Sequence, residues 1–529
     1  MDIKRIQSAF MQFNRRAEGV SQDILTKTFV DAEPLFIQLS SKNHQILYGR
    51  RGTGKTHALK FLMETVIKKG GAPVYIDLRV VGSNGAIYSD PGRPITERAT
   101  RLLTDVLVAL ESELIQIAVA QIDSSPDPKQ ISLRIDDLAE AIRAVEVRGS
   151  IEKEETTEDA AASQSDAKAG VSLDPSKLKV SADVAGKLSS SIKTSSKTKT
   201  TGRLRASIAF GTLQSALSGL LAVLGSPEVW LLIDEWSEIP SDLQPYLADL
   251  LRRTVLPQKN IVVKIAAIEH RSKFAIRNSP GDYIGLEIGA DVTADINLDD
   301  FVVYDVDQKK ALEFYKSLIF KHYVVSETAD AEIKSADDLI AATFTQVPVF
   351  QEFVRAVEGV PRDALNLAAL IARISFGRKI AIEDVRKAAR EWYQQDKMAV
   401  TKANVVLADV LNFIISEVIE RRRTRAFLFP TGQSNPEIDQ LYDARLLHVL
   451  KKSIASKDEP GRRYDVFKID YGCYVDLINT TKSPLGLLSG EETGSYIDVP
   501  PDDYRSIRRA ILRPDELAKA LSEALETQE

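Results

Sequence analysis

The sequence predicts an α/β fold with a parallel sheet, followed by a helical region and by a third unit that mixes helices and strands. Two observations lead to this prediction. Apolar strand-like runs alternate with helical patterns between residues 46 and 304, which is typical of a parallel sheet covered by helices on both faces. After residue 306 the strand-like runs stop, and helical periodicity continues to residue 397.

A chain of 529 residues is too long for one hydrophobic core, so two to four domains are expected. We predict a core over residues 1–305, a helical lid over 306–398 and a C-terminal domain over 401–529. Residues 123–205 are rich in Ser, Lys, Thr, Asp and Ala, and such segments bury too little apolar surface to offset their ordering entropy. They predict a flexible insertion into the core, with a short helix at 133–145. Its basic end could contact an acidic partner or nucleic acid, although a solvated tether is favoured.

The first element of the core is a buried strand at residues 46–48, and a helix follows from residue 57 to residue 68. The segment between them, Gly49–Thr56, reads Gly-Arg-Arg-Gly-Thr-Gly-Lys-Thr and matches the phosphate-loop pattern GxxxxGK[ST] without a mismatch. Its glycines let the backbone turn its N–H groups toward phosphate oxygens. Lys55 would place a charge on the outer phosphates, and the Thr56 hydroxyl could hold Mg²⁺ at the helix N-terminus.

A chance glycine-rich turn is the alternative, and the strand before the loop and the helix after it argue against that reading. We therefore expect ATP to contact the following residues: Gly49, Gly52, Thr53, Gly54, Lys55, Thr56 and His57.

The next elements are a strand at 72–78, long helices at 95–121 and 208–224, and an apolar strand from residue 228. That strand ends in Asp234 and Glu235. Two carboxylates at a strand end are a weak signal alone, but a phosphate loop needs this partner. Asp234 would hold Mg²⁺ directly or through water, and Glu235 would activate the attacking water as general base.

A helix is expected at 241–253 and a further strand at 261–268. Glu269 follows that strand and could reach the outer phosphate, although a plain acidic loop start is equally consistent. Arg252 and Arg253 end the preceding helix. They could enter a neighbouring subunit's site as an arginine finger, or they could neutralise the helix C-terminus. One more core strand is expected between residues 291 and 304.

Within the helical lid, Gly359-Val-Pro-Arg362 precedes a strongly apolar helix. Pro361 suits the first turn of a helix. Arg362 then lies at a helix start, where a cation gains nothing from the helix dipole, so an external anion such as the γ-phosphate is one explanation. A solvated surface arginine is the other.

Together these segments resemble the AAA+ ATPases, within them the origin-recognition and replication-initiator branch, and a bacterial relative is expected. The resemblance covers residues 25–397 apart from the insertion. It implies that Arg362 is a second sensor, that ATP lies between core and lid, and that subunits associate through the site as a homo-oligomer. Glu269 departs from the usual first-sensor Asn, and the insertion departs from the family pattern. The segments that carry the resemblance are Gly49–Thr56, Leu231–Glu235, the strand ending at Glu269, Arg362 and Ile382–Ala388.

The same resemblance implies a C-terminal winged helix. The pattern predicts a helix at 405–421, a strand at 426–429, a helix at 435–447, and strands at 448–454 and 464–469 around a basic turn. That turn and the cluster at 421–425 could contact duplex DNA. Acidic residues are at least as numerous in this domain, so a protein effector is an equal alternative.

Bulk properties add little. The net charge is -6, the single cysteine Cys473 excludes an internal disulfide, and the N-terminus lacks a signal peptide, which together suit the cytoplasm. The uncharged stretch 206–227 is long enough to span a membrane, but its polar residues favour a core helix.

We expect an ATP-hydrolysing switch that acts on DNA or a DNA-linked complex. The alternatives are a regulatory NTPase that binds a protein effector and a scaffold that binds ATP without hydrolysis.

Overall fold

The computed structural model describes residues 2–81, 88–122, 127–145, 147–151, 204–208, 210–224, 228–279, 282–422, 424–433, 435–455, 461–478 and 510–526. The chain forms two compact units, one of residues 1–145 with 210–529 and one of residues 146–209. In the smaller unit, β3 (Val147–Ile151) pairs with β4 (Leu204–Ile208) in antiparallel orientation. The low-complexity stretch 189–201 lies outside the described residues.

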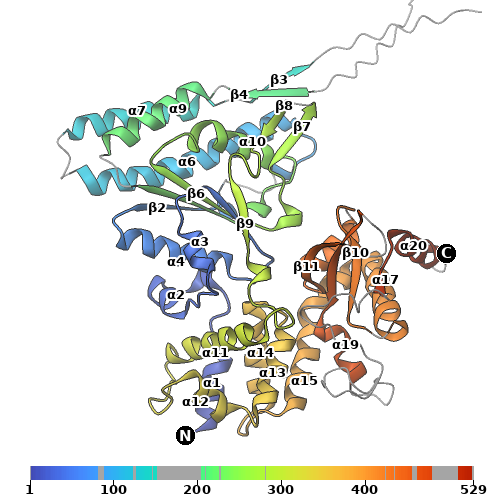
Figure 1. Ribbon diagram of the computed structural model, residues 1–529. Helices are drawn as coiled ribbons and strands as arrows, with labels where there is room; N and C mark the ends of the chain where they lie inside the picture. Colours follow the sequence, from blue (N-terminus) through green and yellow to red (C-terminus); the bar gives the residue numbers. More distant parts are fainter. Residues whose placement is uncertain are drawn as a thin grey trace, which may run out of the picture. The chain divides into compact units, whose positions relative to one another are not determined.

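The centre of the larger unit is a five-stranded parallel sheet in the order β2-β5-β6-β1-β9 (Figure 1). Strands β5 and β6 are buried along their whole length, as central parallel strands are. Because all five strands run the same way, their carboxyl ends meet at one edge, where Tyr48 pairs with Ala267 and Asp77 with Asp234. The strands are β1 (Gln45–Tyr48), β2 (Ala72–Asp77), β5 (Val229–Asp234), β6 (Ile261–Ala267) and β9 (Thr293–Asn297).

Helices pack against this sheet, and the expected helices are found with small shifts at their ends. The 241–253 helix begins later, at Gln244, and passes into a π-type turn at Leu251–Val255. After β6 the chain forms a hairpin that the sequence did not predict. The elements of this region are α2 (Gln22–Thr28), α3 (Leu35–Leu39), α4 (Lys55–Lys68), α6 (Ile95–Ile122), α9 (Gly211–Val223), α10 (Gln244–Leu250), β7 (Ala275–Ser279) and β8 (Asp282–Gly285).

Residues 128–145 correct the predicted extent of the insertion. They form α7 (Pro128–Arg143), which packs on α6 and α9 and belongs to the larger unit. The reason is local: Ile131, Leu138 and Ile142 recur at helical spacing and are buried. The predicted short helix at 133–145 therefore begins earlier, at Pro128, and belongs to the larger unit and not to the insertion.

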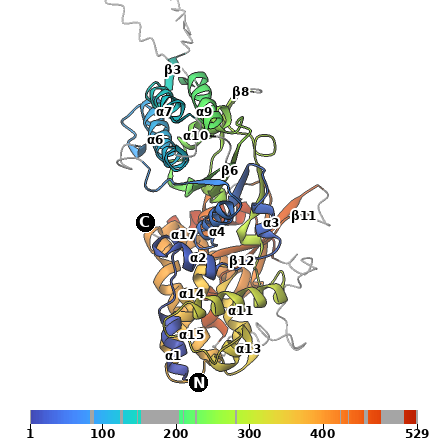
Figure 2. The same cartoon turned by 90° about the vertical axis from the view of Figure 1, so that its left-hand side faces the viewer.

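The helical lid is formed by helices from the second half of the chain together with the N-terminal helix. Although α1 (Ile3–Met11) precedes the core in sequence, it packs on α14, α12 and α11, and Figure 2 shows it beside α14. Its buried residues Ile6 and Phe10 join the lid interior. The other helices are α11 (Gln308–Val324), α12 (Ala336–Thr343), α13 (Val347–Val357), α14 (Pro361–Ile374), α15 (Ile382–Trp392) and α16 (Met398–Ala403).

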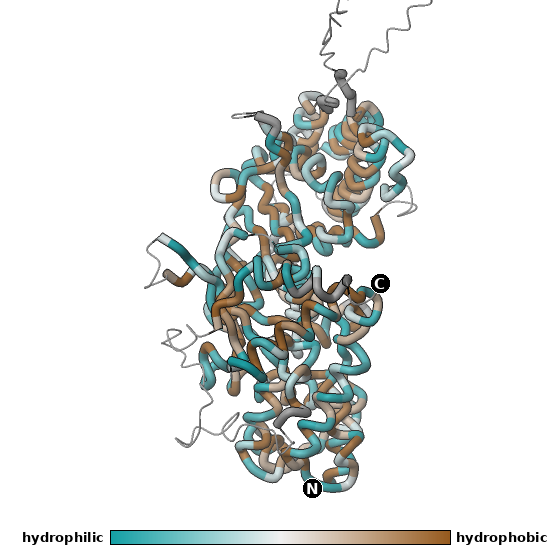
Figure 3. The backbone as a smooth tube through the Cα atoms, turned by 90° about the vertical axis from the view of Figure 1, so that its right-hand side faces the viewer, coloured by the Kyte–Doolittle hydropathy of each residue, from teal (hydrophilic) through white to brown (hydrophobic). Residues whose placement is uncertain are grey.

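The C-terminal domain has the expected winged-helix-like order of helix, strand, helix and hairpin, and its antiparallel sheet has the order β10-β12-β11. One continuous apolar cluster runs from the lid into this domain, and Figure 3 shows hydrophobic and hydrophilic segments alternating along the helices that supply it. The elements are α17 (Val405–Ile414), β10 (Ala426–Pro430), α18 (Pro436–Asp443), β11 (Leu447–Ala455), β12 (Arg463–Ile469), α19 (Tyr471–Ile478) and α20 (Pro514–Glu526).

Among the described residues no single helix is long and apolar enough to cross a membrane. One helix pair, Ile382–Ala403 with Val405–Arg421, reaches that length and composition only together and is bent by 120°. Helix α9, from the uncharged stretch 206–227, buries Leu213, Leu217 and Leu220 inside the larger unit.

Candidate nucleotide-binding site

The phosphate loop lies between β1 and α4, at the edge of the sheet where the strands end. Gly52 and Gly54 have φ values of +92° and +100°, a backbone conformation that other residues rarely adopt. Two of the three loop glycines are therefore required by the turn itself. Helix α4 begins at Lys55, so the loop ends at a helix N-terminus, where backbone N–H groups favour an anion.

Lys55 is buried, and its Nζ atom donates to the carbonyl oxygens of Gly49 (2.7 Å) and Arg50 (3.1 Å). Thr53 also donates from its hydroxyl to the Arg50 carbonyl, at 2.9 Å. Burial lowers the pKa of Lys55, and the nearby carboxylates of Glu235 and Asp234 act in the opposite direction. The ammonium group thus lies inside the loop, with two carboxylates as its nearest opposite charges.

A cavity of about 300 Å³ opens beside the loop. Its lining includes apolar residues, namely Val20, Ile24 and Leu25 of the N-terminal segment with Leu318 and Leu365 of the lid. Charged and polar groups complete the lining. It gathers most of the residues that the sequence predicted for a nucleotide site, namely Gly52, Gly54, Lys55, Thr56, His57, Glu235 and Arg362.

Asp234 and Glu235 end β5 next to this cavity. Asp234 is fully buried and accepts hydrogen bonds from the Tyr75 hydroxyl (2.8 Å) and from the Glu235 N–H (2.9 Å). Glu235 has a φ of +56°, which turns its side chain out of the strand direction, and it lines the cavity. Burial raises the pKa of Glu235, the Asp234 carboxylate raises it further, and Lys55 and Arg79 oppose them. The Arg79 guanidinium lies 3.7 Å from the Glu235 carboxylate.

Arg362 meets the loop directly. It follows Pro361 in the first turn of α14, and its backbone N–H donates to the Gly52 carbonyl at 3.1 Å. A Cβ atom added to Gly52 would lie 3.0 Å from Arg362 Cβ and 3.1 Å from Val360 Cγ1. The lid therefore packs against the phosphate loop at Gly52.

His57 lines the cavity, and its Nε2 atom also donates to the Leu25 carbonyl at 2.7 Å. Because the carbonyl can only accept, this ring nitrogen carries the hydrogen. Burial lowers the pKa of His57, so the ring joins α4 to α2 as a neutral group.

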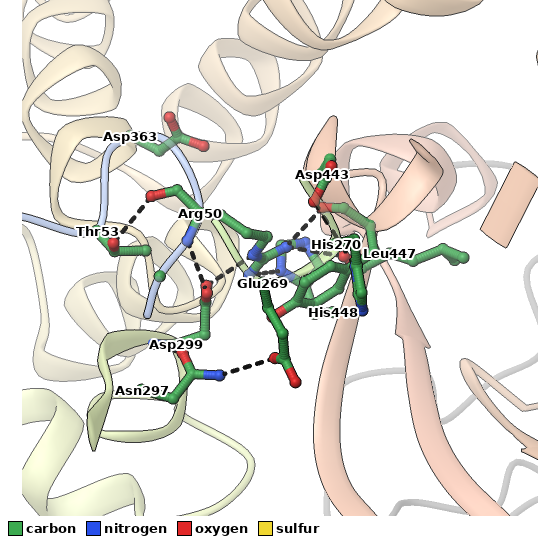
Figure 4. Close-up of polar contacts among 12 residues, drawn as sticks. Arg50, Thr53, Glu269, His270, Asn297, Asp299, Asp363, Asp443, Leu447 and His448 are labelled. Carbon is green, nitrogen blue, oxygen red and sulfur yellow. Dashed lines mark hydrogen bonds and ion pairs between the residues drawn. The ribbon is translucent and has the colours of Figure 1, made fainter. Parts of the chain in front are cut away.

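Six predicted residues do not line the cavity, namely Gly49, Thr53, Asp234, Arg252, Arg253 and Glu269. Arg252 and Arg253 both pair with Asp249 of their own helix, at 2.8 and 2.9 Å. Glu269 follows β6 as predicted, but it pairs with Lys452 of the C-terminal domain at 2.6 Å and accepts a long bond from Asn297 (Figure 4).

Sequence reasoning missed Arg50, the second residue of the loop. Its guanidinium is buried and pairs with Asp299 at 2.6 Å, and Figure 4 shows it between the loop and the strand that carries His448. The motif leaves this position unspecified, and its partners lie 249 and about 400 residues away in sequence. Arg79 was also missed, although it follows β2 at the same edge of the sheet.

Residues 13–77, which include the phosphate loop and β2, match the family model ORC-CDC6-like. No curated protein matches the chain. Distantly similar solved structures include Cdc6p from Pyrobaculum aerophilum, with 12% identity, 96% of this chain and 99% of that chain covered, and a TM-score of 0.30. The Aeropyrum pernix Orc1 protein in complex with DNA has 13% identity, coverage of 85% and 93%, and a TM-score of 0.32. Drosophila ORC bound to DNA has 11% identity, with 87% of this chain and 92% of that chain covered, and a TM-score of 0.28.

The family model confirms the predicted relationship to the origin-recognition branch of AAA+ ATPases. The parallel sheet, the lid helices and the C-terminal domain confirm the predicted fold class. That the relative is bacterial stays a prediction.

Proposed function

We propose that this chain, an AAA+ protein of the ORC-CDC6-like type, binds ATP with Mg²⁺ beside Lys55 and hydrolyses it slowly as a switch. The observation that carries the proposal is that the phosphate loop, Glu235 and Arg362 line one cavity. The phosphate loop follows β1, Glu235 follows β5, and Arg362 lies in the lid helix α14, so these groups come from segments that are far apart in sequence. Their meeting is what a composite nucleotide site requires.

The polyphosphate would lie along the loop N–H groups and Lys55, with Arg362 near its outer end. The apolar residues of the lining, which include Ile24, Leu25 and Leu318, suit the nucleobase. Glu235 would take a proton from the attacking water, and its raised pKa makes it a stronger base than an exposed carboxylate.

The residues present fit a magnesium ion. Mg²⁺ commonly takes one or two carboxylates together with substrate phosphates and waters, and Thr56 and Asp234 offer one hydroxyl and one carboxylate. Asp234 is fully buried and does not line the cavity, so contact through water is favoured. When bound, the ion would neutralise charge on the phosphates. Tyr75 would keep the Asp234 carboxylate oriented.

ATP binding and turnover by the purified full chain test this proposal. Lys55→Ala is expected to abolish binding, whereas Glu235→Gln is expected to retain binding and lose turnover. Turnover that survives in Glu235→Gln would refute the assignment of the base. Sizing in the presence of ATP tests the proposed homo-oligomer, in which Arg252 or Arg253 would have to exchange Asp249 for a neighbour's nucleotide.

We further propose that the C-terminal domain contacts duplex DNA. Arg462, Arg463 and Arg513 are exposed around one groove at the end of the β11–β12 hairpin, which gives the domain a local basic surface. The second predicted basic cluster is unsuited to this role, because Arg422 pairs with Glu417 and Arg425 is buried against Asp305.

DNA affinity as a function of salt concentration separates the two candidate partners. Affinity that falls steeply with salt, and that Arg462→Ala with Arg463→Ala reduces, would support DNA. Absence of binding would leave the protein effector, which the acidic residues elsewhere in the domain favour, as the better candidate.

A further inference from the structure

Arg50 is the best-connected side chain of the phosphate loop. Its backbone N–H and its Nε atom both bind the Asp299 carboxylate, at 2.8 and 2.6 Å. Its other guanidinium nitrogens donate to the C-terminal domain, at 2.9 Å to the Leu447 carbonyl, 3.2 Å to the Tyr442 carbonyl and 3.1 Å to His448 Nδ1. The guanidinium also lies 4.4 Å from the centre of the Tyr442 ring.

The carbonyl of Arg50 is held from the opposite side by loop residues. It accepts hydrogen bonds from Lys55 Nζ and from the Thr53 hydroxyl. Arg50 therefore joins the phosphate-binding lysine to the C-terminal domain, and its backbone N–H and carbonyl groups both have partners. Because a guanidinium presents its donors in a rigid planar fork, a shift of the loop backbone must be matched by a shift in Asp299 or in the C-terminal domain.

The link continues beyond His448 through a chain of buried charges. His448 Nε2 donates to Asp470 at 3.0 Å, and Asp470 pairs with Lys397 at 2.5 Å. Lys397 lies 3.5 Å from Asp363, the residue after Arg362. The chain of contacts thus leaves the phosphate loop, crosses the C-terminal domain and returns to the lid beside the second predicted sensor.

The contacts also determine the tautomer of His448. Since Asp470 accepts only, Nε2 carries the hydrogen and Nδ1 is free to accept from Arg50. Burial lowers the pKa of His448 to about 3, and the Arg50 charge lowers it further, so the ring is neutral. The charged groups around it are paired: Arg50 with Asp299, Lys397 with Asp470, and Arg445 with Asp363 and Asp396.

Resting on the proposed function, we propose that Arg50 is a positioning residue that preorganises the phosphate loop for ATP by anchoring it to His448 of the C-terminal domain. A loop that is already ordered pays less conformational entropy when it binds ATP. By thermodynamic reciprocity, ATP then strengthens the attachment of the C-terminal domain by the same factor. The partner-binding domain would in this way sense the nucleotide through the loop itself, in addition to the lid.

Calorimetric titration of the full chain with Mg-ATP tests whether the contact between Arg50 and His448 raises ATP affinity. His448→Phe removes both ring contacts and is expected to weaken ATP binding at least fivefold, within the usual range of coupling between sites. His448→Gln keeps one donor and one acceptor and is expected to recover most of the affinity. Should His448→Phe not fold, Arg50→Lys gives the same test, because it keeps the charge and loses the fork.

Thr424→Val is the matched control. Thr424 is equally buried in the same domain, and its hydroxyl bonds only to Ala426 in the neighbouring strand. The control is expected to lower the melting temperature and to leave ATP affinity unchanged. An affinity loss of the same size in Thr424→Val would refute the proposal, as would unchanged or tighter binding in His448→Phe.

Cys473 provides the second readout, because it is the single cysteine of the chain and its backbone N–H bonds to the Asp470 carbonyl. Cys473 is partly buried and burial raises the pKa of its thiol, so labelling by a maleimide requires local opening and reports on the attachment of this domain. ATP is expected to slow labelling of the wild type about fivefold and to have no effect in His448→Phe. If ATP does not slow labelling of the wild type, the proposal that ATP strengthens the attachment of the C-terminal domain is overturned.

The two proposals fail in different ways. If the wild type binds no ATP, the proposed function fails. If the wild type binds ATP, Lys55→Ala does not, and His448→Phe binds as tightly as the wild type, only the role of Arg50 fails.

Discussion

Replacing Gly52 by alanine is expected to separate the lid from the phosphate loop. The substitution has two consequences that the structure distinguishes. The φ of +92° is unfavourable for any residue with a Cβ atom, by roughly 1–2 kcal/mol. The new Cβ would also lie 3.0 and 3.1 Å from lid atoms of Arg362 and Val360, and such overpacking adds about 1–3 kcal/mol.

Gly70→Ala is the matched control for this prediction. Gly70 has a φ of +78° at the end of α4, and a Cβ atom added there would meet nothing within 4 Å. The control therefore carries the backbone strain without the clash. Thermal unfolding without nucleotide should show a larger loss for Gly52→Ala, by roughly 1 °C for each additional kcal/mol, because Gly52 lies in the large unit of residues 1–145 and 210–529.

ATP affinity provides the second measurement on the same pair. Gly52→Ala is expected to weaken binding, because the clash pushes Arg362 away from the cavity, and Gly70→Ala is expected to bind as the wild type does. Equal melting temperatures and equal affinities in the two variants would show that the lid does not pack on the loop in solution, and the reasoning would be refuted.

Three further outcomes are expected. Arg79→Gln removes a charge that lowers the pKa of Glu235; since a base works only when deprotonated, the acid limb of the turnover–pH profile should move to higher pH, and a limb that stays in place would argue against the pair. Tyr75→Phe removes a bond to Asp234 and should raise the Mg²⁺ concentration for half-maximal turnover roughly tenfold, whereas an unchanged requirement would count against Asp234 as metal-holding group. Burial lowers the pKa of His322 from 6.5 to about 3. The contribution of the neutral ring to the free energy of unfolding is therefore complete above pH 6.5 and is lost as the pH falls toward 3. Chemical unfolding of the wild type and His322→Leu should then diverge by roughly 1.4 kcal/mol per pH unit between pH 6 and 4, and parallel curves would contradict the shift.

The loop and the acidic strand end could be predicted because their signals are local. Gly49–Thr56 is a contiguous motif, and Asp234 and Glu235 directly follow an unbroken apolar run. The strands and helices around them have strong periodicity, so the fold class followed from the same short-range patterns.

The remaining parts of the site depend on contacts between distant segments. Arg50 occupies a position that the motif leaves open, and its role depends on Asp299 and His448, which local patterns cannot bring together. The roles of Arg252 and Arg253 depend on a second subunit, and within one chain Asp249 holds both. Helix α1 joins the lid because Ile6 and Phe10 fit its interior, and helical periodicity alone does not say which neighbour a helix will choose.

The apolar interior shared by the lid and the C-terminal domain has a consequence for how proteins of this design can diversify. Helix α19 of the C-terminal domain packs on α15 and α13, so a foreign domain exchanged at residue 400 would leave these lid helices without their covering. Exchange of the whole domain is therefore disfavoured. A change of partner is more readily made at the exposed rim, where Arg462, Arg463 and Arg513 can be substituted without disturbing the interior.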